Sequence, residues 1–355
     1  MFLAGRGSVA EGQLDIGGNA GTVNSLLIAG NVTSGDVAQI GSRASGSVAI
    51  GGNLDLQAGT GLFVGTTIGQ DRFVDGATTH INQATGSVAI GGTLRLLGDT
   101  GFVGIGFTNG GSAEGSFSAG AMDMGGARIG NLQVGVSGDG QASGSLRVSG
   151  GTLVVGNAFV GTTIGGTALG ELRLAGMSVV AERVVAGRQG AGGTASARVE
   201  LVGTDADVAD DFELDQGELA LERSLLSIGD AFRLGTGATL RLDIDGPGRG
   251  TEFGAVDALL AFLDGELAVD LSDLSFGGGS MSFDLIRAGG DITGDFTSRL
   301  FIGLDPRYQA LAGIFVDGAG EVYRLTLTRL DVPEPASLLL VLLALSAGWG
   351  LRRRR

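Results

Sequence analysis

Residues 44–56 read ASGSVAIGGNLDL, and residues 84–96 read ATGSVAIGGTLRL, an almost unchanged copy 40 positions further along the chain. Each copy alternates polar or small residues with apolar ones and then reaches a Gly-Gly pair. A period of two is typical of a β-strand with one buried face, and paired glycines are typical of tight turns. Repetition this close indicates an architecture built from successive similar units.

A second phrase shows that the repetition extends beyond these two copies. The sequence FVGTTIG occurs at residues 63–69 and again at residues 159–165. The related unit GSLRVSGG, at residues 144–151, precedes the second occurrence, so two phrases recur in the same order. With the looser copies included, the units start at Gly12, Gly46, Gly86, Gly115, Gly144 and Gly170.

Strands this short cannot bury a face singly, so neighbouring units must stack. We therefore predict an all-β fold, a right-handed parallel β-helix or β-solenoid of glycine-rich repeats over residues 1–203. Glycines at its corners would permit positive φ and close approach of adjacent coils. The alternative is a flexible glycine-rich linker, but Gly and Pro together make up 73 of 355 residues, below the share typical of such linkers.

The repeat fades after about residue 203, and we predict a β-rich capping region over residues 204–331. Asp264-Gly265 predicts a hairpin turn between strands at 256–262 and 266–271, although residues 255–263 could form a short helix instead. An acidic cluster opens the region; it could hold calcium or form a solvated turn, and its spacing matches neither an EF-hand nor a calcium β-roll. The cluster comprises Asp205, Asp207, Asp210, Asp211, Glu213 and Asp215.

The inventory of reactive side chains excludes much catalysis. The chain has no Cys and no Lys, and His80 is its one histidine. Thiolate and Schiff-base chemistry, iron–sulfur clusters and multi-histidine metal sites therefore lack their ligands or nucleophiles. The net charge of −15 repels nucleic acid. We expect no enzyme, no cofactor and no nucleic-acid partner, and we interpret His80, in a polar insertion between the two close copies, as a surface loop residue.

The last 24 residues combine three features in order. A proline motif fixes φ and removes backbone donors, so it is extended and readable by an enzyme cleft. The uncharged run 336–351 predicts a transmembrane helix of about 24 Å, slightly shorter than a typical hydrocarbon core. Terminal arginines would stop translocation, with Trp349 at the membrane interface and the body outside. The motif is Val332, Pro333, Glu334 and Pro335, and the arginines are Arg352, Arg353, Arg354 and Arg355.

This arrangement over residues 332–355 resembles the PEP-CTERM sorting domain of exosortase substrates. The resemblance implies that an exosortase in the membrane recognises Pro333, Glu334 and Pro335 and that the tail is removed. It also implies that the body reaches the cell surface or an exopolysaccharide matrix. The alternative is an ordinary C-terminal membrane anchor after a proline spacer, which gives no reason for Pro-Glu-Pro at this position.

The repeats at residues 144–165 resemble the autotransporter-type repeats that accompany such tags. A signal peptide has a charged segment, an apolar core and a cleavage site, and residues 1–30 show none of the three. Residues 8–18 already have the pattern of a repeat. Stacked repeats normally need a polar end unit, so we expect the sequence to be N-terminally truncated.

Two functions compete at this point. The first is an exported structural or adhesive protein of the cell surface. The second is a polysaccharide-active β-helix enzyme, a lyase or hydrolase, for which Asp243 and Asp245 are a carboxylate pair. Alternating strand residues of this kind simply share one face, and Tyr308, Tyr323 and Trp349 are too few to build an aromatic sugar platform. We favour the first.

Overall fold

The computed structural model describes residues 9–22, 25–33, 43–57, 59, 61–69, 72–75, 78–277, 279–318 and 320–330. Throughout these ranges the fold is all-β and contains no helix, as the sequence predicts. The strands are β1 (Val9–Ile16), β2 (Ala20–Thr22), β3 (Ser25–Thr33), β4 (Arg43–Ile50), β5 (Leu54–Leu56), β6 (Gly61–Gly69), β7 (Arg72–Asp75), β8 (Thr78–Ile81), β9 (Gln83–Leu96), β10 (Thr100–Thr108), β11 (Ser112–Asp123), β12 (Ile129–Ser137), β13 (Gln141–Val148), β14 (Gly151–Val160), β15 (Thr167–Ala175), β16 (Met177–Ala186), β17 (Thr194–Val202), β18 (Asp205–Val208), β19 (Phe212–Glu222), β20 (Leu225–Asp243), β21 (Ala255–Leu263), β22 (Glu266–Asp270), β23 (Ser280–Ala288), β24 (Ile292–Gly294), β25 (Ser298–Ile302), β26 (Tyr308–Asp317) and β27 (Gly320–Arg329).

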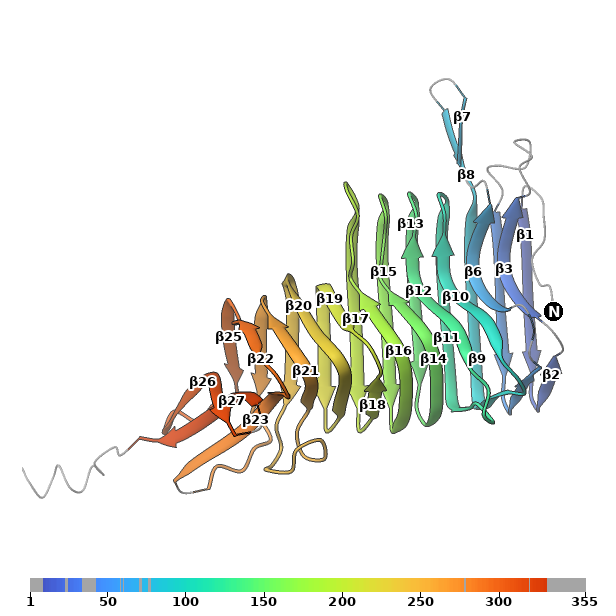
Figure 1. Cartoon of the computed structure of the whole chain (residues 1–355). Coiled ribbons are helices and arrows are strands. Elements are labelled where there is room, and N and C mark those ends of the chain that lie inside the picture. Colours follow the sequence, from blue (N-terminus) through green and yellow to red (C-terminus); the bar gives the residue numbers. More distant parts are fainter. Residues whose placement is uncertain are drawn as a thin grey trace, which may run out of the picture.

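Parallel strands from successive coils stack into a solenoid with three walls (Figure 1). The first wall carries a polar groove and a ladder of charged side chains on its outer face. It consists, in order of pairing, of β1, β4, β9, β11, β13, β15, β17, β19, β20, β22 and β25. The second wall begins with β3, β6, β10, β12 and β14. The third begins with β2, β5 and the C-terminal part of β9.

The repeat starts read from the sequence pair in register. Gly12 lies opposite Gly46, Gly46 opposite Gly86, and Gly86 opposite Gly115. Gly115 in turn pairs with Gly144, and Gly144 with Gly170. The 40-residue coil is the one that contains the antiparallel hairpin β7–β8, which projects from the stack in Figure 1.

Alternating side chains from the three walls fill one continuous apolar core. On the first wall the inward column passes through Val48, Val88, Phe117 and Leu146, all of them buried. Because identical positions of successive coils lie on top of one another, each apolar residue packs on its counterpart in the next coil. The regular alternation in the sequence is therefore the source of the core.

The parallel stack continues past residue 203, where the repeat signature fades. Strands β19, β20, β22 and β25 extend the first wall as far as Ile302. Two of these coils are short, since Ala197 pairs with Gly217 and Gly217 with Ala238. In-register stacking requires alternation and matching strand length, and it does not require the Gly-Ser phrase.

The predicted hairpin at Asp264-Gly265 is wrong. Strand β21 pairs in parallel with β20, β23 and β24, and β22 pairs in parallel with β20 and β25. The Asp264-Gly265 step is therefore a corner between two walls, with Gly265 at φ 70° and the Asp264 carboxylate accepting its amide proton at 2.8 Å. The alternative of a helix at residues 255–263 is also wrong, because β21 occupies them.

An antiparallel sheet ends the described chain. Strand β27 lies between β23 and β26 and is antiparallel to both. Its inward side chains Tyr323, Leu325 and Leu327 are fully buried. This sheet covers the C-terminal end of the parallel stack (Figure 1).

Two columns of glycine bring the first and second walls into backbone contact. Gly86, Gly115 and Gly144 lie in the middle of first-wall strands, where an added Cβ would approach the amide nitrogen of a second-wall glycine to 2.5 Å or less. The second-wall partners of these three residues are Gly65, Gly106 and Gly135, at φ 54°, 62° and 62°. The glycines expected at the corners of the coils are joined by these columns in the middle of strands, where no side chain fits between walls this close.

We predict that Gly144→Ala destabilises the fold by about 2–3 kcal/mol, because its methyl group would overlap the backbone of Gly135 and Ile105. The measurement is urea unfolding followed by circular dichroism. Gly101→Ala is the matched control, since a Cβ there meets nothing within 4 Å, and it should change stability by less than about 0.5 kcal/mol. Equal effects of the two substitutions would contradict the packing of the walls described above.

Candidate functional site

A groove runs along the solenoid on the outer face of the first wall, across β1, β4, β9, β11 and β13. On β4, Ser45 and Ser47 point outward on either side of the inward-facing Gly46. The same arrangement recurs on each neighbouring strand because the repeats are in register. The groove has a volume of about 720 Å³ and is lined by Glu11, Gly12, Gln13, Ser45, Gly46, Ser47, Thr85, Gly86, Ser87, Glu114, Gly115, Ser116, Ser143 and Ser145.

The glycine columns explain where this groove lies. At Gly86, Gly115 and Gly144 the first wall packs directly against the second, so the outer surface of the first wall is recessed at these residues. The side chains flanking each glycine form two rows of mainly hydroxyl groups along the groove. Successive members of a row are separated by the spacing of β-strands, about 4.8 Å. The result is a periodic polar surface that runs parallel to the solenoid axis.

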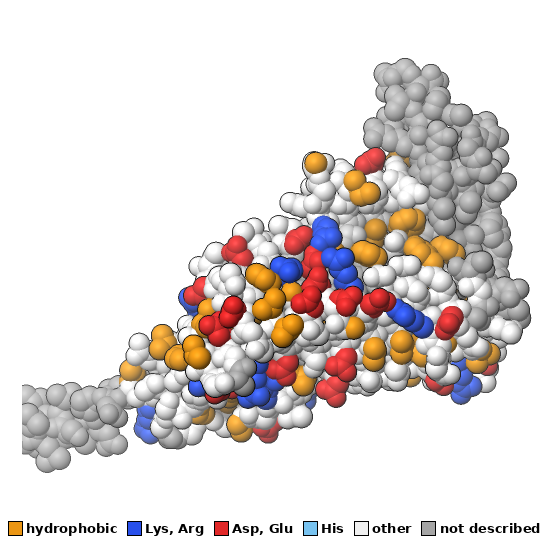
Figure 2. All heavy atoms as spheres, viewed as in Figure 1, with side chains coloured by type: hydrophobic (Ala, Val, Ile, Leu, Met, Phe, Trp, Pro, Cys, Tyr) orange, Lys and Arg blue, Asp and Glu red, His pale blue; other side chains and the backbone are white. Residues whose placement is uncertain are grey.

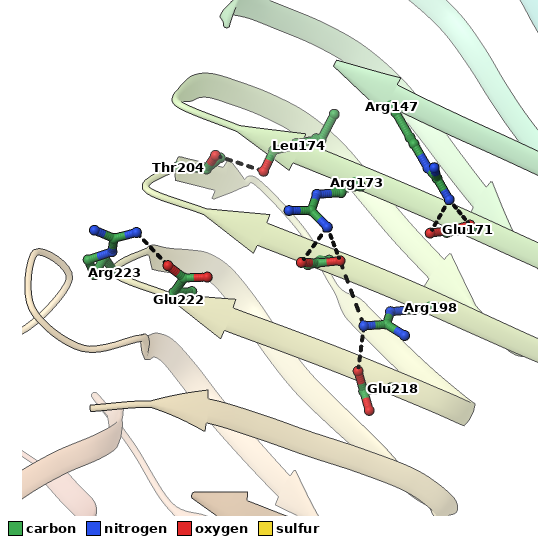
Figure 3. Close-up of polar contacts among 10 residues, drawn as sticks. Arg147, Glu171, Arg173, Leu174, Arg198, Thr204, Glu218, Glu222 and Arg223 are labelled. Atoms are coloured by element: carbon green, nitrogen blue, oxygen red, sulfur yellow. Dashed lines mark hydrogen bonds and ion pairs between the residues drawn. The ribbon is translucent and has the colours of Figure 1, made fainter. Parts of the chain in front are cut away.

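Further along the same wall, the hydroxyl rows give way to a ladder of opposite charges (Figure 3). Arg147 of β13 contacts Glu171 of β15 at 3.0 Å, and Arg173 of β15 contacts Glu200 of β17 at 3.1 Å. Arg198 of β17 lies 3.6 Å from Glu218 of β19. Exposed pairs such as these each contribute little to stability, but like charges at these positions would oppose the register.

The acidic cluster of residues 205–215 forms no metal site in the structure. Asp205 and Asp207 lie on β18 with their side chains on its outer face, whereas Glu213 is buried and pairs with Arg183 and Arg188. No group of three or more Asp, Glu or His side chains in the described ranges is arranged to hold a metal ion.

The cluster belongs to a longer acidic band, residues 201–280. Residues 201–280 carry 17 acidic and 4 basic side chains, a net −13 of the chain's −15. Figure 2 shows charged side chains gathered over the middle of the visible face. The composition of successive windows of the sequence would have revealed this band, because it is a local excess that the overall charge conceals.

Of the carboxylate pair in the enzyme alternative, Asp243 is the last residue of β20 and Asp245 lies in the bend two residues further on. Partial burial, followed by repulsion from Asp245 and Asp270, raises the pKa of Asp243 to about 6. The carboxylate of Asp270 is engaged elsewhere, accepting a hydrogen bond from the Ser272 hydroxyl at 2.6 Å and pairing with Arg241 at 3.2 Å. A small pocket beside Asp243 is lined by Arg198, Glu200, Glu222 and Arg241 among others. Its walls therefore consist largely of charged side chains of both signs.

The predicted sorting residues lie outside the described residues. These are Val332, Pro333, Glu334, Pro335, Trp349, Arg352, Arg353, Arg354 and Arg355. The described chain ends at Leu330, whose amide donates to the Arg307 carbonyl at 2.7 Å, beside the start of β26. The predicted helix 336–351 also falls outside these ranges, and within them no helix has the length and apolarity needed to cross a membrane.

His80 lies in the hairpin β7–β8, where its backbone pairs with that of Phe73. The prediction of an insertion between two repeats is therefore confirmed, although the residue belongs to a strand of that insertion and not to a loop. Its side chain lies outside the described residues.

In this chain a β-solenoid body is followed by the Pro-Glu-Pro, apolar and arginine segments. Together these features define the class of exported proteins with a C-terminal processing signal. The family model described as the PEP-CTERM protein-sorting motif matches residues 331–355. The chain therefore carries a PEP-CTERM sorting domain, and this motif implies export, processing by an exosortase and association with the cell surface. No curated protein matches the chain significantly. The likeness to autotransporter-type repeats rests on the sequence pattern alone.

We predict that Asp243→Asn makes stability less dependent on pH between about 4 and 7. The folded pKa of Asp243, about 6, lies above its ordinary value of 3.8, so folding favours the protonated carboxyl. Its contribution to stability is therefore present below pH 3.8 and lost as the pH rises through about 6.

The measurement is the thermal midpoint of each variant at pH 4 and pH 7. At pH 7 the Asp243→Asn variant should be more stable than the wild type. Asp139→Asn removes a charge from an exposed turn of an earlier coil and should preserve the wild-type difference. An unchanged difference in Asp243→Asn would contradict the burial and repulsion assigned to this carboxyl.

Proposed function

We propose that the chain is a non-enzymatic structural or adhesive protein of the cell surface or of an exopolysaccharide matrix. In this proposal, helix 336–351 holds the chain in the membrane, Pro333, Glu334 and Pro335 are read by the exosortase, and cleavage releases the body. The observation that carries the proposal is the sorting motif at residues 331–355 attached to a long repeat body.

The outer groove supports a role in binding an extended polymer. It is open, crosses five strands of one wall and presents hydroxyl groups at a regular spacing. A polymer with its own short repeat, such as a polysaccharide, could form similar hydrogen bonds with successive coils. Such contacts are individually weak and gain strength by repetition along the chain.

The enzyme alternative has less support. Glycosidases need one carboxylic acid that protonates the leaving group and a second carboxylate beside the scissile bond. Asp243 has the raised pKa of such an acid, but the pocket beside it is small and is lined by the paired charges of Arg198, Glu200 and Arg241. The raised pKa of Asp243 follows here from partial burial and then from repulsion by neighbouring carboxylates, which are structural causes.

Replacement of Pro333, Glu334 and Pro335 by alanine is expected to abolish processing, so the uncleaved chain should accumulate in the membrane fraction. Fractionation with mass spectrometry of the C-terminus measures this outcome. Ser346→Ala, within the apolar run, is the control and should be processed normally. Normal cleavage of the triple-alanine variant would refute recognition of the motif.

The adhesive role predicts that filling the groove reduces retention at the surface. Ser47→Arg, Ser87→Arg and Ser116→Arg together place three long side chains in the groove. The variant should be exported and cleaved as the wild type is, but more of it should be found in the medium. Thr152→Arg with Ser178→Arg adds exposed arginines on another wall and is the control. Equal retention of the groove variant and the wild type would count against the groove as the contact surface.

A further inference from the structure

The strand β26 presents an open edge at the C-terminal end of the body. It pairs with β27 on one side, and on the other side it pairs with no strand in the described ranges. An open edge offers a row of backbone donors and acceptors to a further strand. Proteins commonly protect such edges with charged residues or proline, but residues 308–316 contain neither.

Large apolar side chains line this edge strand. Leu311 is 62% exposed and Val316 is 83% exposed, with Ile314 and Phe315 also exposed. Figure 2 shows hydrophobic side chains on the surface at this end of the body. The sheet between β23 and β26 thus ends in a strand that has both an apolar surface and free backbone groups.

We propose that β26 pairs antiparallel with β26 of a second copy of this chain, about a two-fold axis at Gly313. Such an axis is perpendicular to the sheet, so it pairs residues of the same face. Centred on Gly313, the register places Leu311 opposite Phe315 of the second copy, and Phe315 opposite its Leu311. On the other face, Ala312 lies opposite Ile314, and Ala310 lies opposite Val316.

This register covers each of the exposed apolar side chains of β26. The outer face gains two contacts between an aliphatic and an aromatic side chain, a favourable cross-strand combination. The inner face places each large side chain opposite an alanine, so the pairs fit without crowding. At the centre, the two Gly313 residues face each other, and a Cβ added there meets nothing within 4 Å in the single chain.

The distribution of charge also favours contact between copies at this end. Residues 201–280 carry a net −13, so two copies repel strongly there, whereas residues 281–330 carry six acidic and five basic side chains. No charged residue lies within 308–316, and Gln309 would face Asp317 of the second copy. The inferred contact therefore joins two bodies at a region that is both apolar and nearly neutral.

Single-cysteine crosslinking tests the register, because the native chain contains no Cys. In the full-length chain in mild detergent, Gly313→Cys should form a disulfide-linked dimer at least about tenfold faster than Gly318→Cys. Paired Cα atoms in antiparallel strands lie within the range that a disulfide requires, roughly 4.4–6.8 Å, and the two Gly318 residues would lie far apart. Gly318 is a fair control because it is exposed and a Cβ there also meets nothing within 4 Å.

A second variant separates edge pairing from association through the C-terminal segment. Leu311→Ser with Phe315→Ser, in the Gly313→Cys background, should reduce disulfide formation to the rate of the Gly318→Cys control while leaving the circular dichroism spectrum unchanged. Three results would each overturn the proposal. The first is an equal rate of disulfide formation for Gly313→Cys and Gly318→Cys, and the second is a rate for Gly313→Cys that the serine substitutions do not change. The third is a chain that stays monomeric. Processing by the exosortase does not enter the measurement, so its outcome is independent of the sorting function.

Discussion

Backbone contact between two walls of the solenoid is the constraint on which the rest of the structure depends. Wherever a first-wall glycine faces a second-wall glycine, the walls approach too closely for any side chain. The inward approach fixes the shape of each coil, because apolar side chains on either side of the contact must fill the remaining space. It also makes the outer surface concave above the same glycines, which is why the hydroxyl rows line a groove and not a flat face.

The sequence predicts the repeat body well because an in-register stack repeats the same environment at every coil. The unit starts at Gly46, Gly86 and Gly115 pair with one another in the structure for this reason. The prediction of a hairpin at Asp264-Gly265 is wrong because a hairpin turn and a solenoid corner need the same local residues. Whether the next strand turns back or moves on to another wall depends on long-range pairing, such as that of Leu267 with Leu240.

The groove and the charge ladder could not be predicted in the same way. Both depend on which side chains of different coils become neighbours, and the coil lengths vary between neighbouring repeats. The acidic band was within reach of the sequence, since residues 1–200 carry a net −3 and residues 201–280 a net −13. The effect of the band on the pKa of Asp243 could not be predicted from the sequence, because the raised pKa depends on both partial burial and nearby carboxylates.

An antiparallel sheet forms the C-terminal end of the described body. The last strand of the described chain, β27, is paired on both sides, with β23 and with β26. Tyr323 reinforces the sheet, since its hydroxyl accepts from Arg299 at 2.7 Å and donates to Asp295 at 3.0 Å. Strand β27 is therefore paired on both sides before the sorting domain begins, and cutting the chain after residue 330 would break none of these contacts.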